Sequence, residues 1–535
     1  MVTEYLLPIK IVDSKDVENE QALLRGKDMQ ITIEEQELTT IKKGGYIVLD
    51  FGKELSGGIR LLSRDARVNV RIRLGESVGE ANAELGEKGA QNDHSARDMT
   101  TYIPVLSDNE YFQSAFRFLR IDALDGDLTI KNVYAKYTHI KQEPIGYFKS
   151  ENERANKIFE TAAYTLKLCM QNGTVWDGTK RDRLVWIGDL YPELLAMTDL
   201  YDDCSAVKNA LDFSRKTTPL PAWMNTMPTY TLWWILCLGE YVWRTGDVDT
   251  YYRNKEYLLG AIKQYDEHIG NDGRIATKIF LDWPSHQGSG LITQELFDKW
   301  QSTDTTTDEY YGVVAIAVLA MERAKRLLKI DGTDDSIASD VIARLKRVKG
   351  EPKKVKAAKA LYVYAGLGGN ASDITENGAQ GFSTFMSWVN LTVSHEKGDK
   401  EKTAKACLDY YGTMLDYGAT TFWEDFDIEW TKNACPIDRM PNANEECLHG
   451  DRGKHCYVGY RHSFCHGWSA GVIDYFASCI LGVKRLNDKE ITVNPYPAFG
   501  DMEGCVSLGK GKKVTILVKN GKVSVKASKG IKVKK

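Results

Sequence analysis

Repeated pairs of helical segments constrain the fold of this chain more than any other feature of its 535 residues. From about residue 146 to 485, apolar residues at helical spacing alternate with short polar turns, as in "LCLGEYVWRTGDVDTYYRNKEYLLGAI". In the first helical stretch, Ile158, Ala162, Leu166 and Cys169 mark one apolar face. Paired helices over such a length predict either an open solenoid or a closed toroid of helical hairpins.

The toroid is the better prediction, because the sequence has no tight repeat and long polar and aromatic insertions interrupt the helices at 275–305 and 420–465. Insertions of this kind suit loops that gather around a pocket at one end of a ring. Further helices are expected at about 190–202, 230–245, 250–268, 308–328, 335–348, 375–395, 400–417 and 468–481.

β-like segments flank the helical region on both sides. Residues 1–145 contain short alternating runs such as "ARVNVRIRLGES" and "FRFLRIDAL", broken by Gly and polar turns, which is typical of a β-sandwich. The tail, 486–535, has alternating strands around Asn520 and Gly521, a strong hairpin signal. We therefore expect a multidomain protein with an N-terminal β-sandwich, a central helical toroid (146–485) and a short C-terminal β segment.

Composition and charge argue against several classes of protein. The formal net charge of -4 gives no basic excess, which argues against a nucleic-acid partner. No apolar run is long enough to cross a bilayer, and the N-terminus lacks the pattern of a secretory leader, so we expect no membrane partner and a cytoplasmic location. The 12 Trp and 27 Tyr could in part line a groove that stacks on sugar rings. The sequence leaves the oligomeric state open.

Four of the ten cysteines crowd into the region 431–465: Cys435, Cys447, Cys456 and Cys465. They could form disulfides in an exported protein or bind zinc. Without a leader sequence or a Cys-x-x-Cys pair, reduced thiols are the better prediction. The sequence predicts no metal and no cofactor.

The stretch "DGTKRDRLVWIGD", residues 177–189, concentrates charge between apolar flanks. Asp177, Asp182 and Asp189 could point into one pocket, with Arg181 orienting them. Sugar hydrolysis commonly uses two carboxyl groups, one that donates a proton and one that activates water or attacks. A salt-bridged turn between two helices explains the charge density slightly better if this stretch is considered alone.

A second acidic stretch, "GATTFWEDFDIEW", spans residues 418–430. Glu424 and Asp425 follow Trp423 and a run of small residues that is too small to fill a core. Acids beside Trp suit a sugar subsite, whereas an acidic helix start is an equally good interpretation of composition alone.

The stretch "GYRHSFCHGWSAG", 459–471, has His462 and His466 four residues apart, as two metal ligands on one helix would be. No Glu follows the first His as the metalloprotease pattern requires, so metal binding is the weaker interpretation. His466 could instead contact a substrate hydroxyl, or be an ordinary buried histidine.

Two further loops give weaker signals. In 281–288, Asp282 and Trp283 lie beside Pro and Gly and could form a platform for a sugar ring, although a Trp that anchors the loop to the core is the commoner outcome. The polar loop 88–98 in the β region could touch the helical region, but a solvated excursion is the preferred interpretation.

Together these stretches resemble glycoside hydrolase family 78, the inverting α-L-rhamnosidases built on an (α/α)6 toroid. Nearly the whole chain takes part in the resemblance. Asp177, Arg181, Asp182, Trp186 and the Gly-Asp pair that ends at Asp189 follow the order of the family's first motif. The run from 418 to 424 looks like the family's small-residue run that ends in Trp-Glu.

The resemblance implies an exo-acting hydrolase whose partner is a carbohydrate and which needs no cofactor. Asp182 falls on the position of the general acid and Glu424 on that of the general base. Asp177 and Asp189 look like the residues that grip rhamnose hydroxyls. The other substrate-binding residues implied are Arg181, Trp186, Trp283, Trp423 and His466.

The first motif departs from the family pattern at the acid. Asp182 is one methylene shorter than the family's Glu, and "RDRLVW" is one residue shorter than "RDERLGW", so Glu193 is an alternative acid. The acid must keep its proton near neutral pH, which Asp177 and Asp189 favour and inward-pointing arginines oppose. We therefore predict that Arg181 or Arg183 points away.

Two other functions fit the same residues. A lyase or a hydrolase of uronic-acid sugars could use the same toroid, with Arg181, Arg183 or His466 neutralising an anion. A sugar-binding protein could keep the pocket without the acid. The aglycone and linkage are open at this point.

Overall fold

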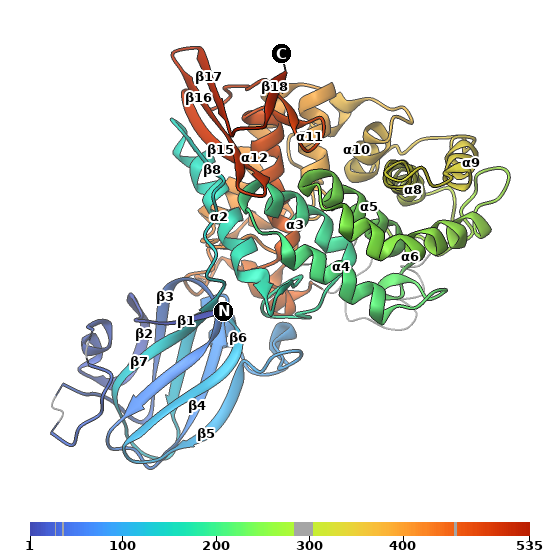
Figure 1. The fold of residues 1–535 in the computed structure, drawn as a ribbon. Helices are drawn as coiled ribbons and strands as arrows, with labels where there is room; N and C mark the ends of the chain where they lie inside the picture. The colour runs from blue at the N-terminus through green and yellow to red at the C-terminus, as the bar shows by residue number, and fades with distance from the viewer. Residues whose placement is uncertain (27, 35–36, 283–302, 454–456, 535) are drawn as a thin grey trace.

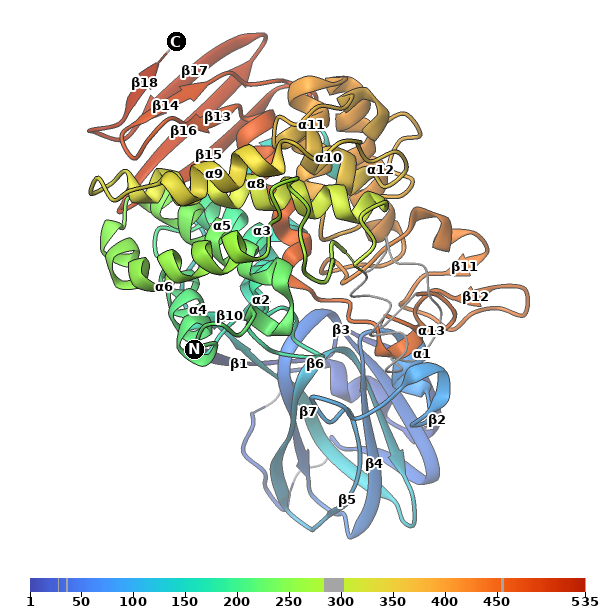
Figure 2. The ribbon, with the colours of Figure 1, turned by 90° about the vertical axis from the view of Figure 1, so that its right-hand side faces the viewer.

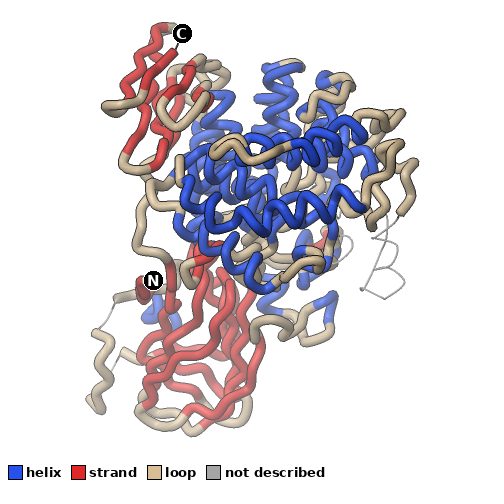
Figure 3. Tube along the Cα trace, turned by 45° about the vertical axis from the view of Figure 1, so that its right-hand side comes forward, coloured by secondary structure: helices blue, strands red, loops and turns tan. Residues whose placement is uncertain are grey.

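The computed structural model of the protein describes residues 1–26, 28–34, 37–282, 303–453 and 457–534. Figure 1 shows a strand-rich N-terminal part below a helical body, with a second group of strands at the far end, where the C-terminus lies. Figure 3 shows the same division by secondary structure, with strands at both ends and helices between them. The fold class is therefore the one that the sequence predicts.

The N-terminal strands are strongly curved and lie together at one end of the molecule (Figure 1). Hydrogen bonds join them into one seven-stranded sheet of order β1-β7-β3-β6-β4-β5, with β2 paired to β3. Strand β3 is 25 residues long and pairs with β2, β6 and β7. Their bounds are β1 (Val2–Leu6), β2 (Lys10–Glu18), β3 (Thr39–Ser63), β4 (Val68–Gly75), β5 (Asp98–Ile103), β6 (Ser107–Ala123) and β7 (Leu128–His139).

Alternation along these strands explains the core. In β3, Ile47, Leu49, Ile59 and Leu61 are fully buried, as is Ile72 of β4. Successive side chains of a strand point to opposite faces, so apolar residues two apart cover the same face. A short helix, α1 (Val78–Asn82), follows β4 and faces the helical body.

Helices that pack in a ring form the body of the protein. Each helix contacts the next in the order α3, α5, α8, α10, α11 and α14. Helix α14 in turn contacts α3, so this ring of described helices is closed. The bounds of the ring helices are α3 (Ile187–Leu200), α5 (Pro228–Thr245), α8 (Asp308–Leu328), α10 (Lys356–Tyr364), α11 (Ser387–Lys397) and α14 (Val472–Tyr475). A second set lies outside them: α2 (Glu153–Cys169), α4 (Ser205–Thr217), α6 (Val248–Glu267), α9 (Ser336–Leu345) and α12 (Lys400–Asp416).

Local signals set where several of these helices begin and end. The Thr307 and Asp399 side chains accept hydrogen bonds from the first-turn amides of α8 and α12. The helix expected over 375–395 begins only at Ser387, so its predicted start is wrong. Gly378 and Gly381 have positive φ angles of 56° and 76°, a conformation that a helix does not contain.

The C-terminal strands form a four-stranded sheet of order β17-β16-β15-β8 and a smaller sheet of order β13-β14-β18. Strand β8 (Tyr147–Ser150) comes from the other end of the helical region and pairs with β15. The predicted hairpin is confirmed, because β16 and β17 pair around Asn520 and Gly521. The remaining bounds are β13 (Val483–Arg485), β14 (Glu490–Val493), β15 (Met502–Gly509), β16 (Lys512–Lys519), β17 (Lys522–Ala527) and β18 (Lys532–Lys534).

None of the helices that the structure describes has the length and apolar character to span a bilayer. Cys435, Cys447 and Cys465 are buried free thiols, and Cys456 lies outside the described residues. The expectation of reduced thiols is thus confirmed for these three.

Candidate active site

The acidic stretches of the sequence meet at the end of the ring where α3, α8, α11 and α14 begin. Residues 177–186 precede α3, residues 418–427 follow α12, and residues 462–467 precede α14. Backbone hydrogen bonds tie the three segments together: the Gly467 N–H donates to the Asp177 carbonyl (2.7 Å) and the Glu424 N–H donates to the Ser463 carbonyl (2.9 Å). Loops far apart in the chain therefore build one buried acidic site.

Asp177 is the most enclosed carboxylate of the first loop. The Leu184 N–H donates to its Oδ1 (2.8 Å), which closes the loop on itself. Burial raises the pKa of Asp177 well above its usual range, and the nearby Asp182 and Asp189 carboxylates raise it further.

Asp189 and Glu193 lie one helical turn apart on α3 and face the same region. The Tyr230 hydroxyl donates to Asp189 Oδ2 (3.4 Å). Burial raises the pKa of Asp189 well above normal, and the Glu424 and Asp182 carboxylates add to it. Glu193 has a strongly raised pKa because it is buried and lies near Asp189 and Asp177. Its Oε1 has no hydrogen-bond partner among the described residues.

Gly467 makes room for the Glu193 carboxyl group. A Cβ at position 467 would lie 1.9 Å from Glu193 Oε1. A side chain there would displace the carboxyl group, so the small-residue run before α14 has a steric purpose.

Arg181 lies between the two carboxylates predicted to act as acid and base. Its Nη1 donates to Asp182 Oδ1 (3.0 Å), and its Nη2 donates to Glu424 Oε1. Burial raises the pKa of Glu424, an effect that the Arg181 guanidinium opposes. One guanidinium thus separates the two groups and holds them on opposite sides.

Arg183 points away from the acids, as predicted for one of the two arginines. Its Nη1 donates to the Gln113 carbonyl (3.0 Å), and its guanidinium lies 4.9 Å from the ring centroid of Trp176. Asp182 and Arg183 have φ angles of 56° and 59°, in the left-handed region that non-glycine residues seldom adopt. This backbone turns the two side chains in different directions.

His466 stands at the centre of the acidic cluster. Its Nε2 lies 3.7 Å from Asp177 Oδ2, 3.8 Å from Asp189 Oδ1 and 3.6 Å from Glu424 Oε1. Burial lowers its pKa well below normal, and Arg181 lowers it further. A neutral imidazole therefore stands among carboxyl groups, two of which have strongly raised pKa values.

The aromatic candidates have different environments. Trp186 lies at the start of α3, edge-on to Tyr230 with ring centroids 5.9 Å apart. Trp423 is fully buried and stacks on Phe464 at 4.4 Å, so its indole supports the Glu424 loop from beneath. Trp283 lies outside the described residues.

A second acidic pair lies next to Glu424. The Ser383 hydroxyl donates to Asp282 Oδ2, and Asp425 shares its surroundings with Asp282, whose charge helps burial to raise the Asp425 pKa well above normal. Both carboxylates line a cavity of about 350 Å³ together with Lys356 and Trp430. The pocket thus begins at Asp425, the residue that follows Glu424 in the chain.

The loop 88–98 contacts the helical body, so the preferred interpretation of it as a solvated excursion is wrong. Ser95 Oγ donates to the Lys180 carbonyl (2.8 Å), and His94 Nδ1 lies 2.8 Å from Asp182 Oδ1. A polar loop of one domain offers partners to the charged loop of another, which composition alone does not reveal.

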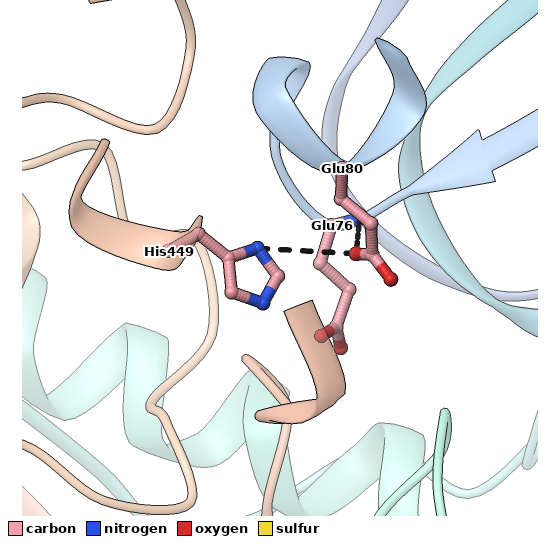
Figure 4. Close-up of side chains that lie close together, drawn as sticks. All are labelled: Glu76, Glu80 and His449. Atoms are coloured by element: carbon pink, nitrogen blue, oxygen red, sulfur yellow. Dashed lines mark hydrogen bonds and ion pairs between the residues drawn. The ribbon is translucent and has the colours of Figure 1, made fainter. Parts of the chain in front are cut away.

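The sequence interpretation also missed a buried cluster of Glu76, Glu80 and His449 (Figure 4). It is the one group of described residues with the spacing of metal ligands. Lys180 Nζ lies 3.0 Å from Glu76 Oε2 and 3.0 Å from Glu80 Oε1, and so supplies the positive charge that the two carboxylates need. Both His449 nitrogens have protein partners, the Ser77 hydroxyl and the His462 carbonyl.

This cluster therefore fits a buried ion pair between domains better than a metal centre. Its position explains why it escaped notice: Glu76 and Glu80 belong to the N-terminal domain, whereas Lys180 belongs to the charged loop before α3.

His462, which the sequence pairs with His466, accepts a hydrogen bond from the Asp425 N–H (2.9 Å).

Comparison with solved structures identifies the class of fold. No protein-family model matches the chain, and no functionally curated protein matches it. Solved rhamnosidases do share its fold: five of them superpose with TM-scores of 0.64–0.69 at 15–21% sequence identity. At this identity the likeness is one of fold.

Three of these structures show how the chains compare. The family 78 rhamnosidase of Bacillus sp. GL1 has a TM-score of 0.69 and 21% identity, over 94% of this chain and 53% of that one. The Streptomyces avermitilis α-L-rhamnosidase in complex with L-rhamnose has a TM-score of 0.67 and 15% identity, over 98% and 49%. The Klebsiella oxytoca rhamnosidase with rhamnose bound has a TM-score of 0.64 and 16% identity, over 89% and 96%. The chain thus spans about half the length of the first and nearly all of the last.

Proposed function

We propose that the protein is an exo-acting glycoside hydrolase that releases terminal α-L-rhamnose with inversion of configuration. The observation that carries this proposal is the position of Arg181 between the Asp182 and Glu424 carboxylates, at the mouth of a buried acidic cluster. The shared fold with solved rhamnosidases, two of which contain rhamnose, supports the choice of sugar.

Inversion requires one carboxylic acid and one carboxylate on opposite sides of the sugar, roughly 6.5–9.5 Å apart. A guanidinium group that binds one carboxylate through each terminal nitrogen suits such a separation better than direct contact would. Asp182 then protonates the glycosidic oxygen as its bond to the anomeric carbon breaks. Glu424 takes a proton from the water that attacks the other face.

The surrounding groups are suited to holding the sugar. Asp177 and Asp189, with raised pKa values, can donate as well as accept hydrogen bonds, which matches the hydroxyl groups of a sugar. His466, neutral because of its lowered pKa, has one donor and one acceptor nitrogen. Trp186 offers an apolar edge beside them. The pocket at Asp282 and Asp425 provides space for the rest of the glycoside.

A panel of aryl glycosides and rhamnose-ended oligosaccharides tests the proposal. We expect release of rhamnose, with the β-anomer as the first product of an α-rhamnoside by proton NMR. Initial formation of the α-anomer would contradict inversion, and an unsaturated product absorbing in the ultraviolet would show a lyase instead.

A sugar-binding protein without turnover is the second candidate. The direct pairing of Arg181 with both carboxylates favours it, since a protonated acid is a poorer partner for a guanidinium than a carboxylate is. Binding of rhamnose by calorimetry, with no turnover on the whole panel, would support this alternative.

A further inference from the structure

The N-terminal domain contacts the charged loop before α3 at Lys180, Asp182 and Arg183. Lys180 Nζ is paired with Glu76 and Glu80, and the Lys180 carbonyl accepts from Ser95 Oγ. Three residues on, Arg183 donates to the carbonyl of Gln113 in β6. The strands and loops of one domain thus position a loop of the other.

His94 makes the contact at the centre of this interface. Its Nδ1 lies 2.8 Å from Asp182 Oδ1 and also accepts the Asp182 backbone N–H at 2.5 Å. The imidazole therefore meets both the carboxyl group and the amide of one residue, which fixes the Asp182 side chain relative to its own backbone.

The backbone on both sides of this contact is strained. His94 has a φ angle of 62° and Asp182 a φ angle of 56°, and neither is a glycine. Left-handed conformations of this kind cost on the order of 1 kcal/mol each and persist where surrounding contacts enforce them. Strain at two facing residues indicates that their meeting is specified by the fold.

The His94 side chain is more exposed than that of Asp182. Asp182 is 17% exposed and faces the buried acids, whereas His94 is 36% exposed and reaches solvent. Arg181, whose Nη1 lies 3.0 Å from the same Asp182 oxygen, is buried. Of the two described groups that these contacts join to the carboxyl oxygen, the imidazole is therefore the more exposed.

We propose that His94, supplied by the N-terminal domain, is the positioning residue for Asp182 as general acid. This inference rests on the proposed function. In the reaction the Asp182 proton goes to the leaving oxygen, and Glu424 accepts one from water. Asp182 then takes a proton from solvent, and Glu424 releases its proton to solvent.

A series of aryl α-L-rhamnosides tests the kinetic part, because a good leaving group needs no proton. For His94→Ala we expect kcat/KM to fall about 10- to 100-fold for phenyl rhamnoside, within the range of general acid catalysis. With 2,4-dinitrophenyl rhamnoside it should stay within about threefold of wild type, since the acid step is dispensable there. His94→Asn keeps an acceptor near the Nδ1 position and should recover part of the loss.

Ser95→Ala is the matched control, because it removes a contact of the same loop with Lys180 and leaves the Asp182 contact intact. Any loss in this variant should be equal for the two leaving groups. An equal loss for both leaving groups in His94→Ala, or no loss at all, would overturn the proposal.

An NMR experiment separates failure of this inference from failure of the proposed function. With histidine labelled at Cε1, the His94 signal is assigned by its disappearance in His94→Asn. We expect Asp182→Asn to shift that signal and Ser95→Ala to leave it nearly unchanged. If wild type cleaves no glycoside, the hydrolase proposal fails. Separately, a His94 signal that Asp182→Asn leaves unshifted would refute the contact between His94 and Asp182.

Discussion

The ring of helices has a buried cluster of charges at each end, and the two clusters are built on opposite plans. At the end away from the candidate site, three arginines meet three acids. Arg244 lies 3.2 Å from Asp199, 2.8 Å from Glu240 and 2.5 Å from Asp474. Arg485 also pairs with Asp199 and Arg323 with Glu240. We call this set the arginine cluster.

The pKa values follow the difference in pairing. Burial acts to raise the pKa of Glu240, but Arg323 and Arg244 hold it at about 2. Burial outweighs Arg485 and Arg244 at Asp199, whose pKa rises only to about 6. At the candidate site, burial raises the pKa values of Asp177, Asp189 and Glu193 well above normal, and neighbouring carboxylates raise them further. At one end of the ring, arginines pair with the buried carboxylates. At the other end, several carboxyl groups with raised pKa values lie close together, as is common in active sites.

The largest expected effect is on turnover. Glu424→Gln removes the proposed base and should lower kcat by about a thousandfold or more, near the upper range for one acid–base group. Steady-state hydrolysis of an aryl rhamnoside measures it. Glu429→Gln, an exposed acid in the same stretch that pairs with Lys432, should leave kcat within about twofold, because an exposed pair contributes little. Similar losses in both variants would remove Glu424 from its role.

The next effect is on stability. Arg244→Met leaves three buried carboxylates without a common partner and should lower the free energy of unfolding by about 3–5 kcal/mol. Urea unfolding measures this change. Arg253→Met, which breaks a half-exposed contact with Asp212, should cost less than about 1 kcal/mol. If the two costs are alike, the arginine cluster is no stabilising element.

A comparison of Asp182→Asn with Glu193→Gln locates the acid. We expect the first to lower kcat on phenyl rhamnoside by about 100-fold and the second by less than about tenfold, since only the proton donor contributes the full acid effect. The reverse order would transfer the acid role to Glu193, whose Oε1 is without a hydrogen-bond partner among the described residues.

The smallest effect is the response of stability to pH. The raised pKa of Glu193 means that the folded protein keeps a proton that the unfolded chain loses above about pH 4.3, so stability falls as pH rises through that window. Glu193→Gln should therefore gain stability over wild type as the pH rises from 4 to 7. Urea unfolding at both pH values gives the difference.

Glu240→Gln should show the opposite trend. With its folded pKa lowered to about 2, Glu240 contributes stability that is present above about pH 4.3 and is lost as pH falls through its folded pKa. The deficit of the variant relative to wild type should thus shrink on acidification. Parallel pH profiles for the two variants would show that the two clusters do not differ.

Periodicity was enough to predict most of the fold. The helices α5, α6, α8 and α12 lie within two residues of their predicted bounds, because their apolar faces and caps are local signals. The sequence interpretation did not single out α4, of 13 residues, or α10, of 9 residues. The last predicted helix is split into 3₁₀, α and π turns over Gly467–Ile480.

The candidate site was predictable where residues follow one another and not where domains meet. The order of Asp177, Arg181, Asp182 and Asp189 was visible in one loop. The loop 88–98 was noticed as polar, but nothing in it pointed to His94, which lies 88 residues from Asp182. The partners of Lys180 were equally hidden, because an ion pair between domains depends on how the domains dock.

Strand β8, the last strand before α2, pairs with β15, which follows the end of the ring. The polypeptide therefore enters and leaves the helical body through neighbouring strands of one sheet. The C-terminal strand β15 thus joins the start of the helical body to its end. Proteolytic removal of the last 35 or so residues would expose the edge of β8 and free the first hairpin from the last. The tail is thus the place where a nick, a fusion or a truncation would loosen the whole molecule from a point remote from its chemistry.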